Sequence, residues 1–179
     1  MLRNEVVLVD VNDNEIRSET KENAHKQPLL HRAFSVFIYN SNNEILVQKR
    51  AAHKYHSSNL WANACCSHPK QKEDVKESAN ERLKDEVGIE TEIEELFSFT
   101  YLNKFNDNLY EYEYDHVFLG KYDGEIILNE EEASETKWIS LDELEQDLTF
   151  NPLKYASWFI ICAPKVIQHL KNHSTSDLI

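Results

Sequence analysis

The segment EDVKESANERLKDEVGI, residues 73–89, carries the strongest structural signal in this chain. Gly88 stands near its end, where a helix C-cap is expected. Apolar side chains recur in the segment every four residues: Val75, Ala79, Leu83 and Val87. This period predicts an amphipathic helix over 74–87, and its apolar face has to pack against another layer of structure.

Strand patterns lie on both sides of this helix. Residues 33–39 (AFSVFIY) and 44–50 (EILVQKR) predict two strands of a hairpin, joined by the turn-forming triplet Ser41-Asn42-Asn43. Further strands are expected at residues 5–11, 91–101, 110–119 and 136–139. The segment 51–72 is predicted to be a long loop, and loops of this length in compact domains are usually functional.

A second helix is expected near the C-terminus. Asn151-Pro152 supplies an N-cap followed by proline at the first helical position, and Pro164 should bend the helix. Its predicted apolar stripe is Leu153, Ala156, Ile160, Ala163, Ile167 and Leu170. With no repeat or linker, residues 1–179 predict one domain of the α/β (α+β) class, a mixed β-sheet with helices packed on its faces.

Composition and charge narrow the possible partners. The chain has 19 Lys and Arg against 32 Asp and Glu, a formal charge of -13, and such a surface repels nucleic acid and anionic lipid. No run approaches the length of a membrane span, and Met1-Leu2-Arg3-Asn4 opens no signal peptide. We therefore expect a cytoplasmic protein without nucleic-acid or membrane partners. Its 3 cysteines cannot form a paired disulfide framework.

Two carboxylates are predicted on an otherwise apolar strand face. On a strand over 110–119, Glu111 and Glu113 share a face with Val117 and Leu119. If this face is buried, the two like charges need a cation or a shared proton. Three histidines could complete a site for Zn or Mn: His25, His31 and His68. The alternative is a solvated edge strand with ordinary surface histidines.

Two further groups of residues also allow two interpretations. Arg82 and Glu86 border the apolar stripe of the 74–87 helix, either as an i, i+4 ion pair or as ligands of a phosphate and a divalent ion. Lys21 and the cluster Lys49, Arg50 and Lys54 suit either a small polyphosphate or solubility.

Cys66 lies two residues before His68. It is either a small buried hydrophobe or a thiol that acts as an acid or nucleophile beside a cationic site.

Taken together, these segments resemble the type I isopentenyl-diphosphate delta-isomerases of the Nudix fold superfamily. The matching stretches are LLHRAFSVFIYN (29–40), LWANACCSHP (60–69), ERLKDEVGI (81–89), YEYEYDHVF (110–118) and the region of Trp158. In the general Nudix box, Ser67 replaces the glycine, Glu73 fits, and Glu81-Arg82 inverts the usual Arg-Glu pair. A box altered in this way argues against diphosphate hydrolysis.

The resemblance implies an isomerase that interconverts isopentenyl diphosphate and dimethylallyl diphosphate in isoprenoid precursor biosynthesis, working as a monomer or weak homodimer on a small isoprenoid diphosphate. It implies Mg2+ and a second divalent metal, Mn2+ or Zn2+, as cofactors. One departure is Ser58-Asn59, where many relatives have Pro-Gly.

The roles that the resemblance assigns cover three parts of one site. The implied catalytic residues are Cys66, Glu113, Tyr101 and Trp158. The implied diphosphate ligands are Lys21, Arg50, Lys54 and Arg82. The implied metal ligands are His25, His31, His68, Glu111 and Glu113 for the second metal and Glu86 for Mg2+.

Two other functions remain open at this point. One is a Nudix hydrolase of nucleoside diphosphate derivatives, which would release phosphate, and the other is a metal-binding module without catalysis, in which Cys66 would be dispensable.

Overall fold

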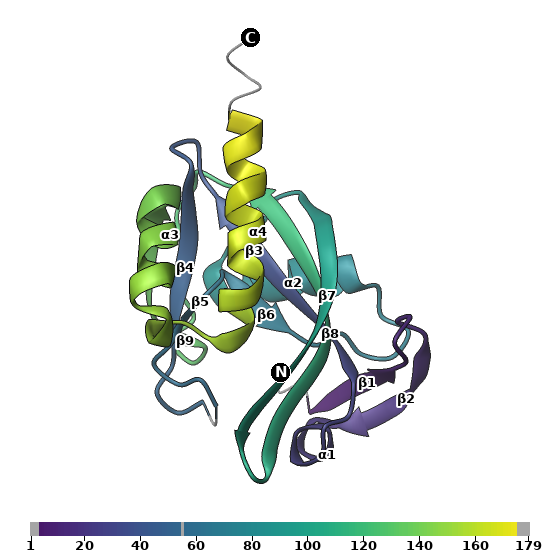
Figure 1. Ribbon diagram of the computed structural model, residues 1–179. Helices are drawn as coiled ribbons and strands as arrows, with labels where there is room; N and C mark the ends of the chain where they lie inside the picture. Colours follow the sequence, from purple (N-terminus) through teal and green to yellow (C-terminus); the bar gives the residue numbers. More distant parts are fainter. Residues whose placement is uncertain (1–3, 55, 175–179) are drawn as a thin grey trace.

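The computed structural model describes residues 4–54 and 56–174, which form a mixed sheet with helices on both faces (Figure 1). The strands are β1 (Glu5–Val9), β2 (Glu15–Thr20), β3 (His31–Tyr39), β4 (Glu44–Arg50), β5 (Trp61–Ala62), β6 (Cys65–Ser67), β7 (Ile93–Asn106), β8 (Leu109–Lys121) and β9 (Ala133–Ser140). The helices are α1 (Lys21–Lys26), α2 (Val75–Val87), α3 (Leu141–Phe150) and α4 (Ser157–Ser174), with a 3-10 turn η1 (Pro152–Lys154). The expected fold class is confirmed.

Strand β3 lies at the centre of the sheet. Along one edge it pairs in parallel with β8, from His31 opposite Glu113 to Tyr39 opposite Lys121. Its other edge is shared by three antiparallel partners in turn, β1, β6 and β4. Strands β3 and β4 pair at Tyr39 and Ile45 in the predicted hairpin, and the short strands β5 and β6 are inserted between them further along.

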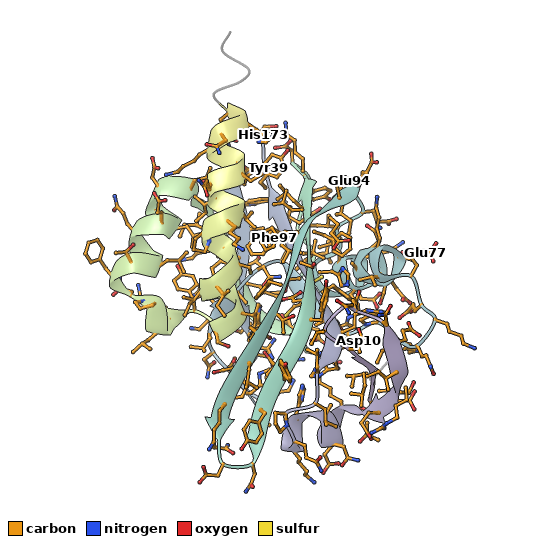
Figure 2. All side chains as sticks on the ribbon, turned by 45° about the vertical axis from the view of Figure 1, so that its right-hand side comes forward. Asp10, Tyr39, Glu77, Glu94, Phe97 and His173 are labelled. Carbon is orange, nitrogen blue, oxygen red and sulfur yellow. The ribbon has the colours of Figure 1, made fainter. Side chains whose placement is uncertain are left out.

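Alternation along β3 separates two buried layers. Phe34, Val36 and Ile38 pack with the apolar stripe of α2, whereas Phe37 packs with α4. Figure 2 shows Phe97 of β7 beneath α4, where it belongs to the second layer. The side chains at positions 31, 33 and 35 share the face of Phe37, so polar residues there lie on the side of the sheet that α4 covers.

The predicted helix signals at residues 74–88 are confirmed. Asp74 caps α2 by accepting a hydrogen bond from the Glu77 amide, and Gly88 ends the helix in the left-handed region at φ 70°. A left-handed C-cap favours glycine because a β-carbon is strained there.

One expectation about the helices needs correction, and the segment before β3 holds elements that the sequence analysis did not predict. These are strand β2 and helix α1, and Thr20 caps α1 by accepting from the Asn23 amide. Asn151-Pro152 opens only the turn η1, and α4 begins at Ser157 and runs through Pro164 to Ser174. Leu153 is therefore 89% exposed and does not belong to the apolar stripe of α4.

None of the helices in the described part of the chain is both long enough and apolar enough to cross a bilayer.

Candidate active site

Four predicted metal ligands lie close together at the start of β3, the central strand of the sheet. Helix α1 brings His25, the first residue of β3 is His31, His68 follows β6, and β8 brings Glu113. Their ligand atoms all lie within 4.8 Å of one another. Residues from four separate segments converge here because β3 pairs with both β6 and β8.

The tautomer of His31 suits metal binding. Its Nδ1 lies 2.8 Å from the Leu29 carbonyl oxygen, which can only accept, so Nδ1 carries the proton. The lone pair of Nε2 then points into the cluster, 3.5 Å from Glu113 Oε1. Nε2 is buried and makes no hydrogen bond within the described residues. A divalent ion would supply the missing partner.

Burial keeps the other two imidazoles neutral at pH 7. It lowers the pKa of His25 to about 2 and the pKa of His68 to about 4, because a buried imidazolium loses its hydration. Neutral imidazole is the form that binds metal. Three imidazoles and one carboxylate are typical of a transition-metal site.

Tyr101 links the two predicted carboxylates. Its hydroxyl is hydrogen-bonded to Glu111 and lies 2.7 Å from Glu113 Oε2. A phenol has one proton, so both contacts are satisfied when Glu111 is protonated. Burial, reinforced by the charge of Glu113, raises the pKa of Glu111 to about 8, which favours that form at neutral pH.

The Glu113 carboxyl is held ionised. Burial alone would raise its pKa, but interactions with the imidazoles of His31 and His68 outweigh burial and keep the pKa well below its usual value. His68 Nε2 lies 2.8 Å from Glu113 Oε1. Glu111 lies outside the group of four ligands within the described residues and instead contacts His56 Nε2 at 3.2 Å.

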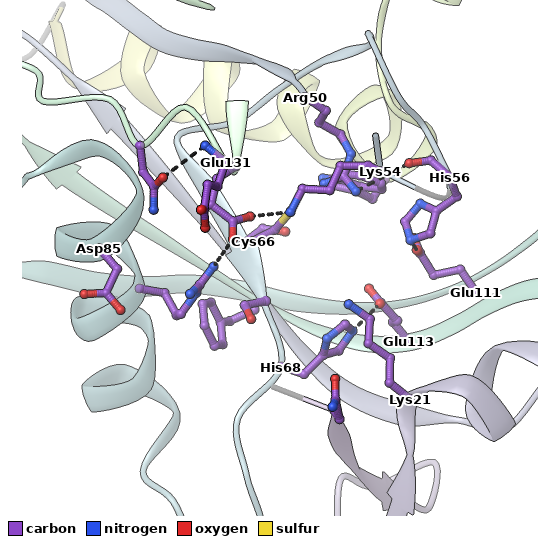
Figure 3. Close-up of a pocket in the computed structure, with 18 of the residues that line it drawn as sticks. Lys21, Arg50, Lys54, His56, Cys66, His68, Asp85, Glu111, Glu113 and Glu131 are labelled. Carbon is purple, nitrogen blue, oxygen red and sulfur yellow. Dashed lines mark hydrogen bonds and ion pairs between the residues drawn. The ribbon is translucent and has the colours of Figure 1, made fainter. Parts of the chain in front are cut away.

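Cys66 lines a cavity of about 640 Å³ that also includes Glu113, Tyr101 and Trp158 (Figure 3). Cys66 is paired with Ser35 across β6 and β3, so its thiol is on the same face of the sheet as Glu113. Burial raises the pKa of the thiol, which therefore stays protonated at neutral pH.

Trp158 is fixed in the wall of this cavity. The indole Nε1 donates to Asn63 Oδ1 at 3.0 Å, and Asn63 in turn donates to the carbonyls of Val36 and Cys65 at 3.1 and 2.7 Å. The Arg50 guanidinium carbon lies 5.2 Å from the centroid of the Trp158 ring. The indole face thus already contacts a cation.

The four predicted diphosphate ligands all line the cavity: Lys21, Arg50, Lys54 and Arg82. Figure 3 shows Lys21 beside Glu113 and His68. Burial lowers the pKa of Lys21. In a chain of charge -13, these bases form the cationic part of the site.

The structure contains one feature of each interpretation of Arg82 and Glu86. They form an i, i+4 ion pair at 2.6 Å, as the first interpretation has it, and Arg82 also lines the cavity, as the second requires. The second oxygen of Glu86 accepts from Gln48 at 3.2 Å. Glu86 is 3% exposed, and its pKa is raised by burial against the opposing charge of Arg82. A buried carboxylate beside a guanidinium that lines the cavity suits Mg2+, which would take the place of these donors.

Three functional candidates are absent from the sequence-based prediction: His56, Asp115 and Glu132. Asp115 continues the alternation of Glu111 and Glu113, so the strand pattern contained a signal for it. It is 1% exposed and accepts from Ser35 Oγ at 2.8 Å, and burial raises its pKa. His56 and Glu132 lie in loops, where no periodicity reveals their direction.

Comparison with known proteins identifies the family of the chain. Residues 29–159 match the NUDIX domain family. The chain is similar to Isopentenyl-diphosphate Delta-isomerase 2 of Aromatoleum aromaticum, with 43% identity over 93% of this chain and 88% of the relative. It is also similar to Isopentenyl-diphosphate Delta-isomerase 2 of Photorhabdus laumondii, with 44% identity over 86% and 87% of the two chains.

Solved structures show the same fold at low sequence identity. A protein from Deinococcus radiodurans superposes with a TM-score of 0.68 and 18% identity over 82% of this chain and 90% of its own. A MutT protein from Methanosarcina mazei gives a TM-score of 0.61 and 16% identity, over 81% and 95% of the two chains. Because the matched relatives share more than two fifths of their residues with most of this sequence, the chain belongs to the isopentenyl-diphosphate Delta-isomerase family of NUDIX-domain proteins.

Proposed function

We propose that this domain interconverts isopentenyl diphosphate and dimethylallyl diphosphate, with Cys66 and Glu113 as the two proton-transfer groups. The observation that carries the proposal is the cavity in which a protonated thiol and an ionised carboxylate stand with an indole and four bases. A cavity of about 640 Å³ is large enough for a small isoprenoid diphosphate.

The reaction requires these two kinds of group. One proton adds to the terminal carbon of the double bond, positive charge develops on the tertiary carbon, and a neighbouring methylene group loses another proton. An acid and a base must both reach the alkene, and water must be excluded until the second proton leaves. The face of Trp158 would stabilise the developing cation by about 2 kcal/mol when desolvated.

The protein supplies an acid and a base of opposite character. Cys66 retains its proton because burial raises its pKa, so the thiol can donate. Glu113 is ionised and can accept a proton. Tyr101 positions Glu113 through the 2.7 Å hydrogen bond to Oε2. The reverse reaction exchanges the two roles, and the order of the two transfers is left open.

The cofactors in this proposal are two divalent ions. His25, His31, His68 and Glu113 would hold Mn2+ or Zn2+ together with Glu111, which would lose its proton on metal binding. Glu86 would hold Mg2+ at the diphosphate. When bound, the first ion supplies positive charge that orders the Glu113 carboxylate, and the second offsets the charge of the diphosphate. Lys21, Arg50, Lys54 and Arg82 would bind the diphosphate oxygens.

We also propose that the domain acts in the cytoplasm as a monomer or weak homodimer, without nucleic-acid or membrane partners. The support is the charge of -13, which disfavours approach to phosphate backbones and anionic lipid.

Product analysis in D2O tests the reaction. Incubation with isopentenyl diphosphate, Mg2+ and Mn2+ should give dimethylallyl diphosphate with solvent deuterium in a methyl group, because the acid exchanges with solvent before it protonates the alkene. A parallel assay for released phosphate should stay at background, since a Nudix hydrolase would release it. Product without deuterium would contradict the protonation step, and phosphate release without isomerisation would favour the hydrolase.

A further inference from the structure

Glu132 contacts two of the bases that we assign to the diphosphate. Its Oε2 lies 2.5 Å from Lys54 Nζ, and its Oε1 lies 3.4 Å from Nη2 of Arg82. Lys54 follows β4, Arg82 is on α2, and Glu132 precedes β9, yet all three side chains line the same cavity. Lys54 and Arg82 therefore already bind a carboxylate, although both are assigned to the phosphate oxygens of the ligand.

The backbone holds Glu132 at this place. Its carbonyl accepts from the Ala51 amide at 3.2 Å, and its amide donates to the Asn129 carbonyl at 3.0 Å. Asn129 in turn donates to the carbonyl of Glu86 at 2.8 Å, which ties the segment to α2. The next residue, Ala133, begins β9 opposite Arg50. These backbone contacts and the start of β9 hold Glu132 next to Lys54 and Arg82.

The charges in this part of the cavity cancel. Lys54 and Arg82 face Glu132, and Arg82 also faces Glu86, so two positive and two negative side chains form one connected network. The side chains of Lys54, Arg82 and Glu132 are 24%, 12% and 25% exposed, so water screens their pairs only in part. An incoming anion meets no net positive charge here unless Glu132 gives up its partners.

We propose that Glu132 is an internal counter-ion, which competes with the ligand for Lys54 and Arg82 and lowers the affinity of the site for phosphate groups. A single phosphate relies on these two bases and binds weakly. A diphosphate also reaches Lys21 and Arg50 and can still displace the carboxylate. The inference rests on the proposed function, because it takes the position of the diphosphate from it.

Glu132→Gln tests the inference, because it removes the charge at nearly constant shape. Calorimetry with inorganic phosphate and with pyrophosphate, each with and without Mg2+, should show binding about tenfold tighter than in the parent, since two partly exposed ion pairs no longer compete. The KM for isopentenyl diphosphate should fall by a similar factor. Glu132→Ala provides a second reading should the first variant unfold.

Glu131→Gln is the matched control. Glu131 is exposed, lines the same cavity and forms no ion pair with Lys54 or Arg82 within the described residues. This variant changes the net charge equally, so any general effect of charge appears in both proteins. We expect affinities within about twofold of the parent, because a solvent-exposed carboxylate is screened.

Three outcomes would overturn the inference: equal affinities in the two Gln variants, weaker pyrophosphate binding in Glu132→Gln, as expected if Glu132 helps to hold Mg2+, or a parent protein that binds no pyrophosphate. The isomerase assay separates these from a failure of the proposed function. Tighter pyrophosphate binding in Glu132→Gln by a protein that never isomerises would support the counter-ion and contradict the reaction.

Discussion

Three successive inward positions of β8 are carboxyl groups: Glu111, Glu113 and Asp115 are 3%, 6% and 1% exposed. Three buried anions in a row would be prohibitively costly, so each is compensated differently. Glu113 is ionised among histidines, whereas burial raises the pKa values of Glu111 and Asp115 and favours their protonated forms. On this face of β8, the ionised carboxylate of Glu113 therefore lies between two carboxyl groups that keep their protons.

The proton-transfer roles give a prediction for Cys66 and Glu113. Cys66→Ala and Glu113→Gln should each lower kcat by about 10² to 10⁴, the usual scale of general acid–base catalysis. Cys66→Ser should retain a trace of activity, since a hydroxyl has the reach of a thiol but is a much weaker acid. Rates of dimethylallyl diphosphate formation measure this, and circular dichroism checks folding. A Cys66→Ala protein as fast as the parent would refute the mechanism.

Alternation along the strand placed Glu111 and Glu113 on one face with apolar residues, but it did not decide between a buried face and a solvated edge strand. The same rule covers Asp115, but the compensation of these charges could not be predicted, because it comes from residues remote in the sequence. His56 contacts Glu111 from the loop after β4, and Ser35 contacts Asp115 from β3. Contacts of this kind depend on tertiary packing, which leaves no periodic trace in either segment.

Among the elements, α2 is the one whose boundaries were predicted most closely, because local chemistry sets them. Gly88 allows the left-handed C-cap at φ 70°, and a β-carbon added there would lie 2.7 Å from Cβ of Ile127. The segment containing Ile127 is bound to the end of the helix through the Ile127 amide and the Val87 carbonyl at 3.0 Å. Gly88 therefore serves both the backbone conformation and the close approach.

We predict that Gly88→Ala lowers the free energy of unfolding by about 1 to 3 kcal/mol, through the left-handed strain and the contact with Ile127. Urea denaturation monitored by circular dichroism measures the change. Ile127→Gly is the control, because it removes the contacting β-carbon, and Ile127 is 65% exposed, so that the loss of its side chain should cost little packing. The double variant should recover the part due to the contact; no recovery would mean that the backbone strain alone is responsible.

The turn between α3 and α4 was predicted less well, because tertiary contacts override its helical pattern. Tyr155 is 2% exposed and donates to Asp147 Oδ2 at 2.7 Å, and Lys154 pairs with Asp147 Oδ1 at 3.1 Å. These contacts end η1 and turn the chain before α4 begins at Ser157. They also place Trp158 at the cavity, which the apolar spacing of the segment did not reveal.

This turn gives a prediction that depends on pH. The hydrogen bond from Tyr155 lowers the pKa of Asp147 below its ordinary value of 3.8. A depressed carboxyl pKa stabilises the fold above pH 3.8, and this stabilisation is lost as the pH falls through the folded-state pKa. Tyr155→Phe should therefore cost about 1 kcal/mol at pH 7 and less near pH 3. Urea melts at both pH values measure it, and a cost that does not depend on pH would contradict the ionic origin.

At the scale of the whole molecule, the group of His25, His31, His68 and Glu113 joins segments that are far apart in the chain. Its members lie on α1, on β3, after β6 and on β8. An ion bound here would favour the folded state over the unfolded chain, because an unfolded chain does not bring these ligands together.

Removal of metal should therefore lower stability. A protein loaded with Mn2+ or Zn2+ should melt several degrees higher than the same protein treated with EDTA, because an ion at 100 times its Kd adds about 2.7 kcal/mol. His68→Ala should bind less metal by elemental analysis and show a smaller difference between the two states. An equal difference in the parent and in His68→Ala would place the ion elsewhere.

The central position of β3 also matters during synthesis of the chain. A ribosome releases β3 early, but the parallel partner of β3 occupies residues 113–121. Until that later segment emerges, the backbone N–H and C=O groups along one edge of this apolar strand have no partner. Strands of other chains can then pair with them. Slow translation between β3 and β8 would therefore favour aggregation of this protein, and a chaperone that covers extended apolar segments would have to act within that interval.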